Sequence, residues 1–496
     1  MARIGRREAL FAAAAGILAA LTMPGFGAPW LAYVALVPLF LALERGAGFL
    51  AGLLFGLAFF ALDLRWILTL TRFNPLLPLG FVALVLYLAI PFGLFGVLMR
   101  WRARRHETWA WLLLAPTLFV LVEVLRAQGP LGTGFSMLHQ ALYRVPWLIQ
   151  SAAILGSWSI TALIVGVNAS FALAWRTRRV RYALIGVGLF LVQCSFALLP
   201  GRPSESIEPI DVAVVASTVD QEVKLDGRNL PSLTERYLAL TEEAAATNSD
   251  LIVLPESFLP AYLLHRDEIL GRFVDVASDV GARLLFGTGD YRSDDAREIY
   301  NATVLIDADG RIAGIYDMVR PVPFGEYIPA RSMLEAIGLG TWARSLLPLD
   351  LSRGTTFAPL GEIGTPICFE STFPTAARRL TANGARVLVT VTNDAWFDGS
   401  SELWAHFSTA VFRAVETRRP TVQAANGGVS GMIDARGHIV ESTTEEGVLT
   451  GRVAPSTEAS IYVRWGDGPF VVATAILALL GLLRRLWRVR GKRNGE

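Results

Sequence analysis

Cys368 is the residue whose type and setting most directly suggest chemistry in this chain. It follows a short apolar run, Gly364-Thr-Pro-Ile, and is followed by Phe369 and Glu370. The chain has 2 cysteines, and the other, Cys194, lies in a separate apolar stretch, so no disulfide is expected. A thiol at the end of a buried strand is well placed to act as a nucleophile, because a strand-to-helix turn presents its side chain. An inert buried thiol is the alternative.

Glu256 is the second candidate, because it follows the apolar run Leu251-Ile-Val-Leu-Pro255. A carboxyl group at the end of a buried strand loses contact with water, and its pKa rises toward neutral. Such a group can act as a general base that takes the proton of a thiol. A solvated acid in a loop between a strand and a helix is the alternative.

The elements that must position these residues belong to a chain too apolar to be wholly soluble. Of its 496 residues 53% are hydrophobic, and the mean hydropathy is +0.45. Stretches long enough to cross a hydrocarbon core of about 30 Å lie at 9–25, 29–43, 47–66, 77–99, 109–126, 151–175, 182–200 and 469–487. We predict eight spans, and a re-entrant hairpin is the alternative for the first two.

The basic residues predict the orientation of these spans. With eight crossings, the arginine-rich clusters at 3–7, 45, 100–105, 176–181 and 484–493 fall on one side of the membrane. By the positive-inside rule that side is the cytoplasm. We therefore expect a transmembrane domain at 1–200 with about seven spans, an extracytoplasmic domain at 201–468, and a final helix with a basic tail at 469–496. The first apolar stretch is interpreted as an uncleaved helix, because no small-x-small cleavage site follows it.

The polar segment 201–468 alternates short strand-like runs with helical runs. Strands are predicted at 211–217, 250–255, 283–289, 303–307, 311–317, 363–369, 386–392, 421–425 and 430–434. Helices are predicted at 231–247, 264–281, 373–383 and 402–418. This mixture indicates a layered α/β domain.

Several longer strings of residues are specific enough to indicate a family. They include Val322-Pro-Phe-Gly-Glu326-Tyr, Asn393-Asp-Ala-Trp-Phe397, Ala424-Ala-Asn-Gly-Gly428 and Tyr462-Val-Arg-Trp-Gly-Asp467. In these strings and their order the chain resembles the apolipoprotein N-acyltransferases, a membrane-bound family of the carbon–nitrogen hydrolase (nitrilase) superfamily. The resemblance implies a polytopic α-helical membrane domain of about eight spans plus an extracytoplasmic α/β nitrilase-like αββα sandwich.

The resemblance also implies a reaction and a setting. An acyl chain would pass from phospholipid to a cysteine thioester, and then to the N-terminal amine of the diacylglyceryl-cysteine of an apolipoprotein. It implies that Cys368 is the nucleophile, Glu256 the general base, and Glu326 and Glu370 supporting acids. The enzyme would be a multi-pass monomer of the bacterial inner membrane, with its catalytic domain on the periplasmic face. The bilayer, the phospholipid donor and the apolipoprotein acceptor are its expected partners, and we expect no cofactor, metal or nucleic acid.

Met318 departs from the family pattern, because the resemblance implies a lysine two residues after Tyr316. Methionine supplies no charge and no hydrogen-bond donor. The lysines of the chain are Lys224 and Lys492, and we expect neither to replace it, so nearby Arg320 is the first substitute. The departure keeps open a catalytically weakened or inactive homologue that binds lipid or lipoprotein. A membrane-tethered amidase or nitrilase-like hydrolase is a further alternative.

Three other polar residues receive structural interpretations. His406 is interpreted as a packed helical residue, and the 5 histidines show no metal-ligand spacing. Glu123 and Arg126 lie one helical turn apart at the end of a span. We predict that they pair at the interface, and binding of lipid headgroups is the alternative.

Overall fold

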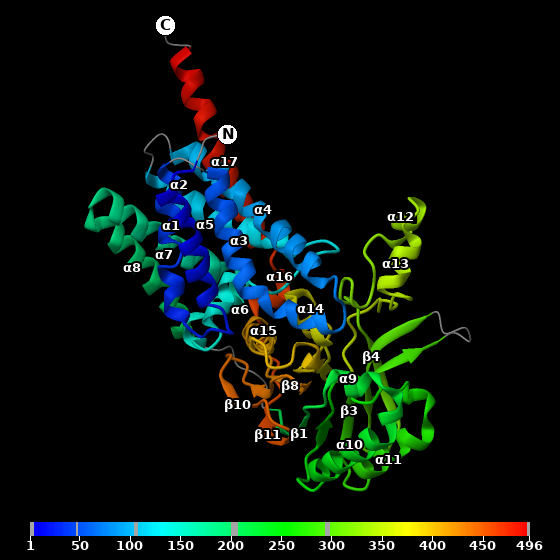
Figure 1. The fold of residues 1–496 in the computed structure, drawn as a ribbon. Helices are drawn as coiled ribbons and strands as arrows, with labels where there is room; N and C mark the ends of the chain where they lie inside the picture. The colour runs from blue at the N-terminus through cyan, green and yellow to red at the C-terminus, as the bar shows by residue number, and fades with distance from the viewer. Residues whose placement is uncertain (1–3, 46–47, 104–107, 200–206, 293–297, 494–496) are drawn as a thin grey trace. The chain divides into compact units, whose positions relative to one another are not determined.

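The computed structural model describes residues 4–45, 48–103, 108–199, 207–292 and 298–493 (Figure 1). These form two compact units. One comprises Met1–Gln128, Gly134–Pro200 and Trp465–Glu496, and the other comprises Gly129–Thr133 and Gly201–Arg464. Arg3, Arg104 and Arg105, which were used above to predict orientation, lie outside the described residues, as do residues 47 and 200 at the ends of two predicted spans.

The first unit is helical throughout its described part. Its elements are α1 (Arg6–Leu21), η1 (Pro29–Tyr33), α2 (Val37–Arg45), α3 (Gly48–Asp63), η2 (Leu64–Arg72), α4 (Leu77–Ala103), α5 (Thr108–Arg126), η3 (Leu138–Leu142), η4 (Pro146–Leu148), α6 (Ala152–Leu155), α7 (Trp158–Thr177), α8 (Val180–Ser195), η5 (Phe196–Leu198) and α17 (Gly468–Arg493). Four helical stretches are long and apolar enough to cross a membrane, namely Gly48–Arg72, Leu77–Trp101, Trp158–Thr177 and Val180–Leu198. Apolar side chains on their surfaces, such as Leu79 and Leu184, are exposed, as expected of helices that face lipid.

Two of the predicted spans are not single helices. The stretch 29–43 is divided between the short 3-10 helix η1 and α2. The stretch 151–175 is interrupted at Gly156, whose φ of 76° ends α6 before α7 begins. Hydropathy detects apolar length but does not detect such breaks, so the count of eight spans stays a prediction.

Small residues allow α3 and α4 to pack closely. A Cβ added at Gly52 would lie 1.9 Å from the carbonyl oxygen of Phe92, and one at Gly96 would lie 2.0 Å from that of Gly48. Close backbone approach of this kind is typical of helix pairs in membranes, where small residues replace hydrophobic side chains at the contact.

Glu123 and Arg126, which were predicted to pair, interact electrostatically, and each also forms hydrogen bonds to other groups. Glu123 accepts hydrogen bonds from the Leu138 backbone N–H (2.7 Å) and the Thr161 hydroxyl (2.8 Å). Arg126 donates to the carbonyl oxygens of Ser136 (3.1 Å) and Phe135 (3.2 Å). Both side chains are buried and hold the segment that follows α5, because its backbone offers the donors and acceptors that they require.

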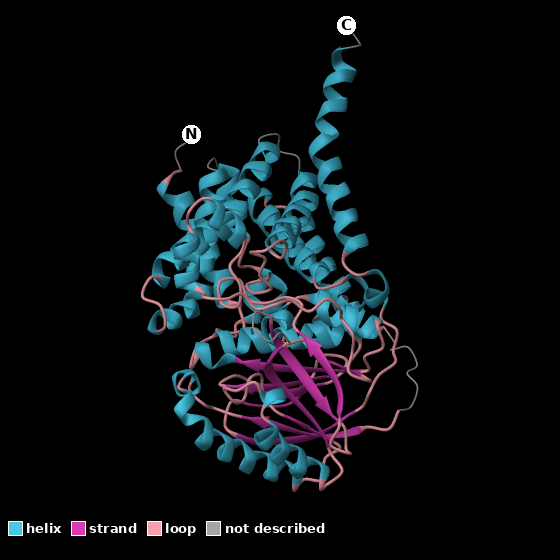
Figure 2. Cartoon of the chain, turned by 90° about the vertical axis from the view of Figure 1, so that its right-hand side faces the viewer, coloured by secondary structure: helices cyan, strands magenta, loops and turns pink. Residues whose placement is uncertain are grey.

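The second unit contains two mixed β-sheets, and Figure 2 shows all strands gathered together. One sheet has the order β11-β1-β2-β3-β4-β5 and the other β10-β9-β8-β7-β6. The strands are β1 (Ile210–Ala216), β2 (Leu251–Val253), β3 (Arg283–Tyr291), β4 (Ile299–Ile306), β5 (Ile312–Asp317), β6 (Ile363–Gly364), β7 (Val387–Asn393), β8 (Thr421–Asn426), β9 (Ser430–Ile433), β10 (Ile439–Thr443) and β11 (Gly447–Val453). The nine strands predicted from the sequence correspond to β1 to β9, whereas β10 and β11 were not predicted. The prediction for β6 was too long, because it ran to Phe369.

Alternating side chains of these strands build two cores. Val212 and Val214 of β1 pack with Val389 and Val391 of β7, so this core lies between the sheets. Ala213 and the other alternate residues of the first sheet pack against helices α10 (Leu230–Ala245) and α11 (Asp267–Ser278).

Helices α14 (Pro374–Ala382) and α15 (Glu402–Thr417) pack against the second sheet, which completes an αββα sandwich. The remaining short helices of the unit are α9 (Gln221–Leu225), η6 (Gly227–Asn229), η7 (Leu263–His265), α12 (Arg331–Ala336), α13 (Gly340–Leu346), η8 (Cys368–Thr372), η9 (Asp394–Phe397) and α16 (Ile461–Trp465).

Candidate active site

Cys368 lies at a sharp turn at the end of a strand. Ile367 still bridges to Val391 of β7, and Cys368 then begins η8 with a φ of 43°. A positive φ is strained for a residue with a side chain, and such strain is concentrated at functional sites. The turn is held from behind, because a ring nitrogen of His406 lies 3.0 Å from the Cys368 carbonyl oxygen.

The Cys368 thiol requires a base in order to react. Burial raises its pKa well above the usual value, and the charges of Glu256 and Asp394 raise it further. The thiol is therefore protonated at neutral pH. A thiolate forms only when a neighbouring group accepts the proton.

Glu256 is the first candidate, because its charge acts on this thiol. It follows β2 after Leu254 and Pro255, its carboxylate is buried, and it interacts electrostatically with the Cys368 thiol. Burial raises the pKa of Glu256, which gives it the basicity needed to take a thiol proton. Gly287 of β3 makes this position possible, because a Cβ there would lie 2.6 Å from the Cα of Glu256.

Asn301, on β4, joins Glu256 to Glu326. Its Nδ2 donates to Oε1 of Glu256 (2.6 Å) and to Oε1 of Glu326 (3.1 Å). Burial and the charge of Glu256 raise the pKa of Glu326 to about 7. Two carboxylates held by one amide resist ionising together, so a proton on Glu326 favours the ionised form of Glu256, which can accept the thiol proton. Sequence reasoning missed Asn301, because nothing local distinguishes it from other strand residues.

Glu370 is close in sequence to the thiol but serves a different part of the structure. Its oxygens accept hydrogen bonds from the Tyr316 hydroxyl (2.8 Å) and from the backbone N–H groups of Val319 (2.9 Å) and Arg320 (3.2 Å). Burial raises its pKa to about 7. Glu370 thus ties the segment after β5 to the nucleophile turn, and this geometry suits a positioning residue.

Met318 lies beside the acids, at the place where a lysine was expected. It is buried, and its sulfur lies 3.7 Å from Nδ2 of Asn301. The side chain at position 318 therefore contacts the same amide group that binds Glu256, but methionine carries no charge.

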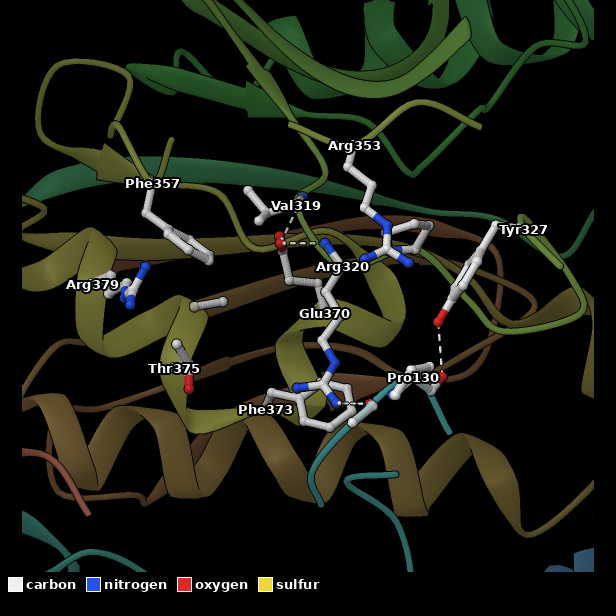
Figure 3. Close-up of a pocket in the computed structure, with 13 residues that line it drawn as sticks. Pro130, Val319, Arg320, Tyr327, Arg353, Phe357, Glu370, Phe373, Thr375 and Arg379 are labelled. Atoms are coloured by element: carbon white, nitrogen blue, oxygen red, sulfur yellow. Dashed lines mark hydrogen bonds between the residues drawn. The ribbon is translucent and has the colours of Figure 1, made fainter. Parts of the chain in front are cut away.

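Arg320, the substitute predicted from sequence, lines a neighbouring pocket together with Glu370. Its guanidinium lies 3.3 Å from the centre of the Phe373 ring and donates to the Gly129 carbonyl oxygen (3.4 Å) (Figure 3). The pocket has a volume of about 480 Å³, and Arg353 and Arg379 also line it. Burial lowers the pKa of Arg320 to about 10, so it remains charged.

Lys224 is the functional candidate that sequence reasoning dismissed. It lies on α9, is 4% exposed, and its charge acts on Glu256. Burial lowers its pKa to about 8, and the attraction of Glu256 limits that fall. One hint of a role for this residue was present in the sequence, because Lys224 is the one lysine of the 201–468 segment.

A second buried group of ionisable residues lies behind the nucleophile turn. Asp394, Glu402 and His406 place three atoms of the kind that bind metals within 4.8 Å of one another. His406 Nδ1 lies 2.9 Å from Asp394. Burial lowers the pKa of His406, but Asp394, Glu402 and the Cys368 carbonyl together raise it to about 9. Since one ring nitrogen faces Asp394 and the other faces the Cys368 carbonyl, the geometry favours a role for His406 in holding the turn.

Comparison with known proteins gives a consistent result along the whole chain. Residues 223–462 match the carbon-nitrogen hydrolase family, and residues 15–170 match the apolipoprotein N-acyltransferase N-terminal domain. The apolipoprotein N-acyltransferase of Geobacter metallireducens is 34% identical over 97% of this chain and 96% of its own length, and that of Gloeobacter violaceus is 32% identical with the same coverage. Among solved structures, the C. elegans NitFhit protein covers 50% of this chain and 61% of its own, with 18% identity and a TM-score of 0.41.

Proposed function

The chain belongs to the apolipoprotein N-acyltransferase family, and we propose on that premise that Cys368, with Glu256 as its base, transfers an acyl chain from phospholipid to apolipoproteins. The observation that carries the proposal is the strained Cys368 turn together with the buried Glu256 carboxylate, whose charge acts on the thiol. Glu326 and Glu370 take supporting roles, the first by holding a proton beside Glu256 and the second by holding the turn.

The first half-reaction forms a thioester. Glu256 takes the thiol proton, and the Cys368 sulfur attacks the ester carbonyl carbon of the phospholipid. A C–S bond forms, the C–O bond to glycerol breaks, and the proton passes from Glu256 to the glycerol oxygen, releasing lysophospholipid. Covalent catalysis suits this reaction, because two bulky lipid substrates use one site in turn.

The second half-reaction forms the amide. The N-terminal amine of the diacylglyceryl-cysteine attacks the thioester carbonyl carbon, so a C–N bond forms and the C–S bond breaks. Glu256 takes a proton from the amine and returns it to the Cys368 sulfur. The site is then ready for another phospholipid.

The pocket around Arg320 suits the phosphate of a lipid headgroup, and we assign the donor headgroup to it. Arg320, Arg353 and Arg379 line the pocket. Arg320 lies over Phe373, Arg353 over Tyr327 (4.4 Å to the ring centre) and Arg379 over Phe357 (5.3 Å). The three guanidinium groups supply positive charge and N–H donors, and arginine suits two-point binding of phosphate.

The same proposal includes the topology of the chain. Residues 201–468 lie on the extracytoplasmic face of the bacterial inner membrane, and the protein works as a monomer. The basic clusters support this orientation. We expect a thiol reagent to label Leu230→Cys from outside and Arg490→Cys only from inside. Labelling of both positions from one side would contradict the proposed topology.

The chemistry is tested by mass spectrometry of the protein after incubation with phospholipid. We expect an acyl adduct on Cys368 in the native chain and in Cys194→Ser, and none in Cys368→Ser. An equal adduct in Cys368→Ser would overturn the proposed mechanism.

A further inference from the structure

The candidate site contains several buried groups that become negative on losing a proton. Glu256, Glu326 and Asp394 all act electrostatically on the Cys368 thiol, and Glu256 also interacts with each of the other two acids. Like charges in a buried site disfavour ionisation of every member. Besides the hydrogen bond from Asn301, a positive charge close to Glu256 favours its ionised form, which can accept the thiol proton.

Lys224 is a buried cation whose charge acts on this site. It is 4% exposed, and among the described residues its Nζ has no hydrogen-bond partner. Its charge acts on the Glu256 carboxylate. A buried ammonium without hydrogen bonds is costly unless a negative group compensates it, and Glu256 supplies that compensation.

The helix that carries Lys224 is fixed to the ends of the strands. The side chain of Asp220 caps α9 by accepting from the Glu222 N–H (2.7 Å). Oε1 of Gln221 accepts from Nδ2 of Asn393 (2.9 Å), at the end of β7, and Asn393 in turn accepts from Asn426 (2.8 Å), at the end of β8. Lys224 is therefore held in place by the framework of the site.

The other cations near the site have different tasks. The Arg320 guanidinium lies against Phe373 in the pocket of Figure 3. His406 lies 2.9 Å from Asp394 and holds the Cys368 carbonyl. Met318, which contacts Asn301, is uncharged.

We propose that Lys224 is the positioning residue that supplies the positive charge of this site, keeping Glu256 ionised against Cys368 where position 318 offers none. The charge comes from α9 and acts on Glu256 directly, whereas a cation at 318 would act beside Asn301. The inference rests on the proposed function, because it gives Glu256 the role of the base. The groups that face Glu256 are Lys224 from α9, Asn301 from β4, Glu326 from the segment after β5, Cys368 from η8 and Asp394 from η9.

The test measures the rate at which iodoacetamide alkylates Cys368 as a function of pH, in the full-length protein carrying Cys194→Ser. Lys224→Met removes the charge with little change in side-chain length, and Lys224→Arg keeps the charge. We expect Lys224→Met to shift the alkylation profile upward by about 1–3 pH units, the usual effect of losing an opposite charge. We expect Lys224→Arg to shift the profile less than Lys224→Met does. Adding Met318→Lys to Lys224→Met should reverse the shift.

An unchanged pH profile in Lys224→Met would overturn the inference, as would a shift that Met318→Lys fails to reverse while the melting temperatures agree. If Lys224→Met does not fold, Lys224→Gln replaces it with the same expectations. Alkylation involves no lipid, so the two proposals fail separately. A profile that depends on Lys224, without any acyl adduct from phospholipid, would leave the charge assignment intact and refute the acyltransferase function.

Discussion

Replacing Asn301 by alanine removes the group that holds two carboxylates together. Nδ2 of Asn301 donates to Glu256 (2.6 Å) and to Glu326 (3.1 Å), and the bond to Glu256 stabilises the ionised base. A hydrogen bond to a charged group contributes about 1.5–3 kcal/mol. Its loss therefore predicts a decrease of about 10- to 150-fold in the rate of thioester formation at neutral pH.

The assay is single-turnover formation of the Cys368 acyl adduct, followed by mass spectrometry from pH 6 to pH 9. The hydrogen bond from Asn301 partly offsets the rise that burial causes in the pKa of Glu256. Asn301→Ala should therefore raise this pKa and move the pH–rate profile to higher pH. Thr303→Ala is the matched control, since Thr303 is buried two residues along the same strand and its hydroxyl has no partner among the described residues. If Asn301→Ala and Thr303→Ala give the same rate and profile, the assignment of Glu256 as a base tuned by Asn301 is refuted.

Three further predictions concern stability, the backbone and the headgroup. The melting temperature should fall as the pH rises from about 4.5 to about 7. Burial raises the pKa of Glu326 and of Glu370 to about 7, so unfolding in this range releases protons. Glu370→Gln should make the melting temperature less dependent on pH, and an unchanged dependence in calorimetry would contradict the assignment. Gly287→Ala should displace Glu256 and lower the free energy of unfolding by about 1–3 kcal/mol. Gly271→Ala should not lower it, because a Cβ there meets no atom within 4 Å. Equal denaturation midpoints for the two variants would contradict the close contact between position 287 and Glu256. Arg379→Ala should raise the KM for phospholipid several-fold with little change in kcat, while exposed Arg272→Ala should change neither, and equal KM values would remove the headgroup assignment.

The sequence predicted best those features that depend on local order along the chain. Strands β1 to β9 follow from runs of apolar residues, and Cys368 and Glu256 were located because each follows such a run. Glu326 was located through a longer string, which the family resemblance made specific. The weak periodicity of β10 and β11, which are half exposed, explains why they were missed.

Features that depend on contacts between distant segments could not be predicted in this way. Lys224 lies 4% exposed beside Glu256 only because α9 is tied to the ends of β7 and β8. Asn301 meets Glu326 because β4 pairs with β5, which delivers the following segment to the same edge of the sheet. Arg320 follows Met318 by two residues, but the turn of the backbone sends its side chain toward Phe373.

The central claim is acyl transfer to an amine, and one measurement tests it most directly. The native chain is loaded with isotopically labelled acyl chain from phospholipid, freed of excess lipid, and mixed with a peptide that begins with diacylglyceryl-cysteine. The account predicts that the label leaves Cys368 and appears as an amide on the N-terminus of the peptide. Release of the label only as free fatty acid, at the same rate with and without peptide, would contradict the account and indicate a hydrolase.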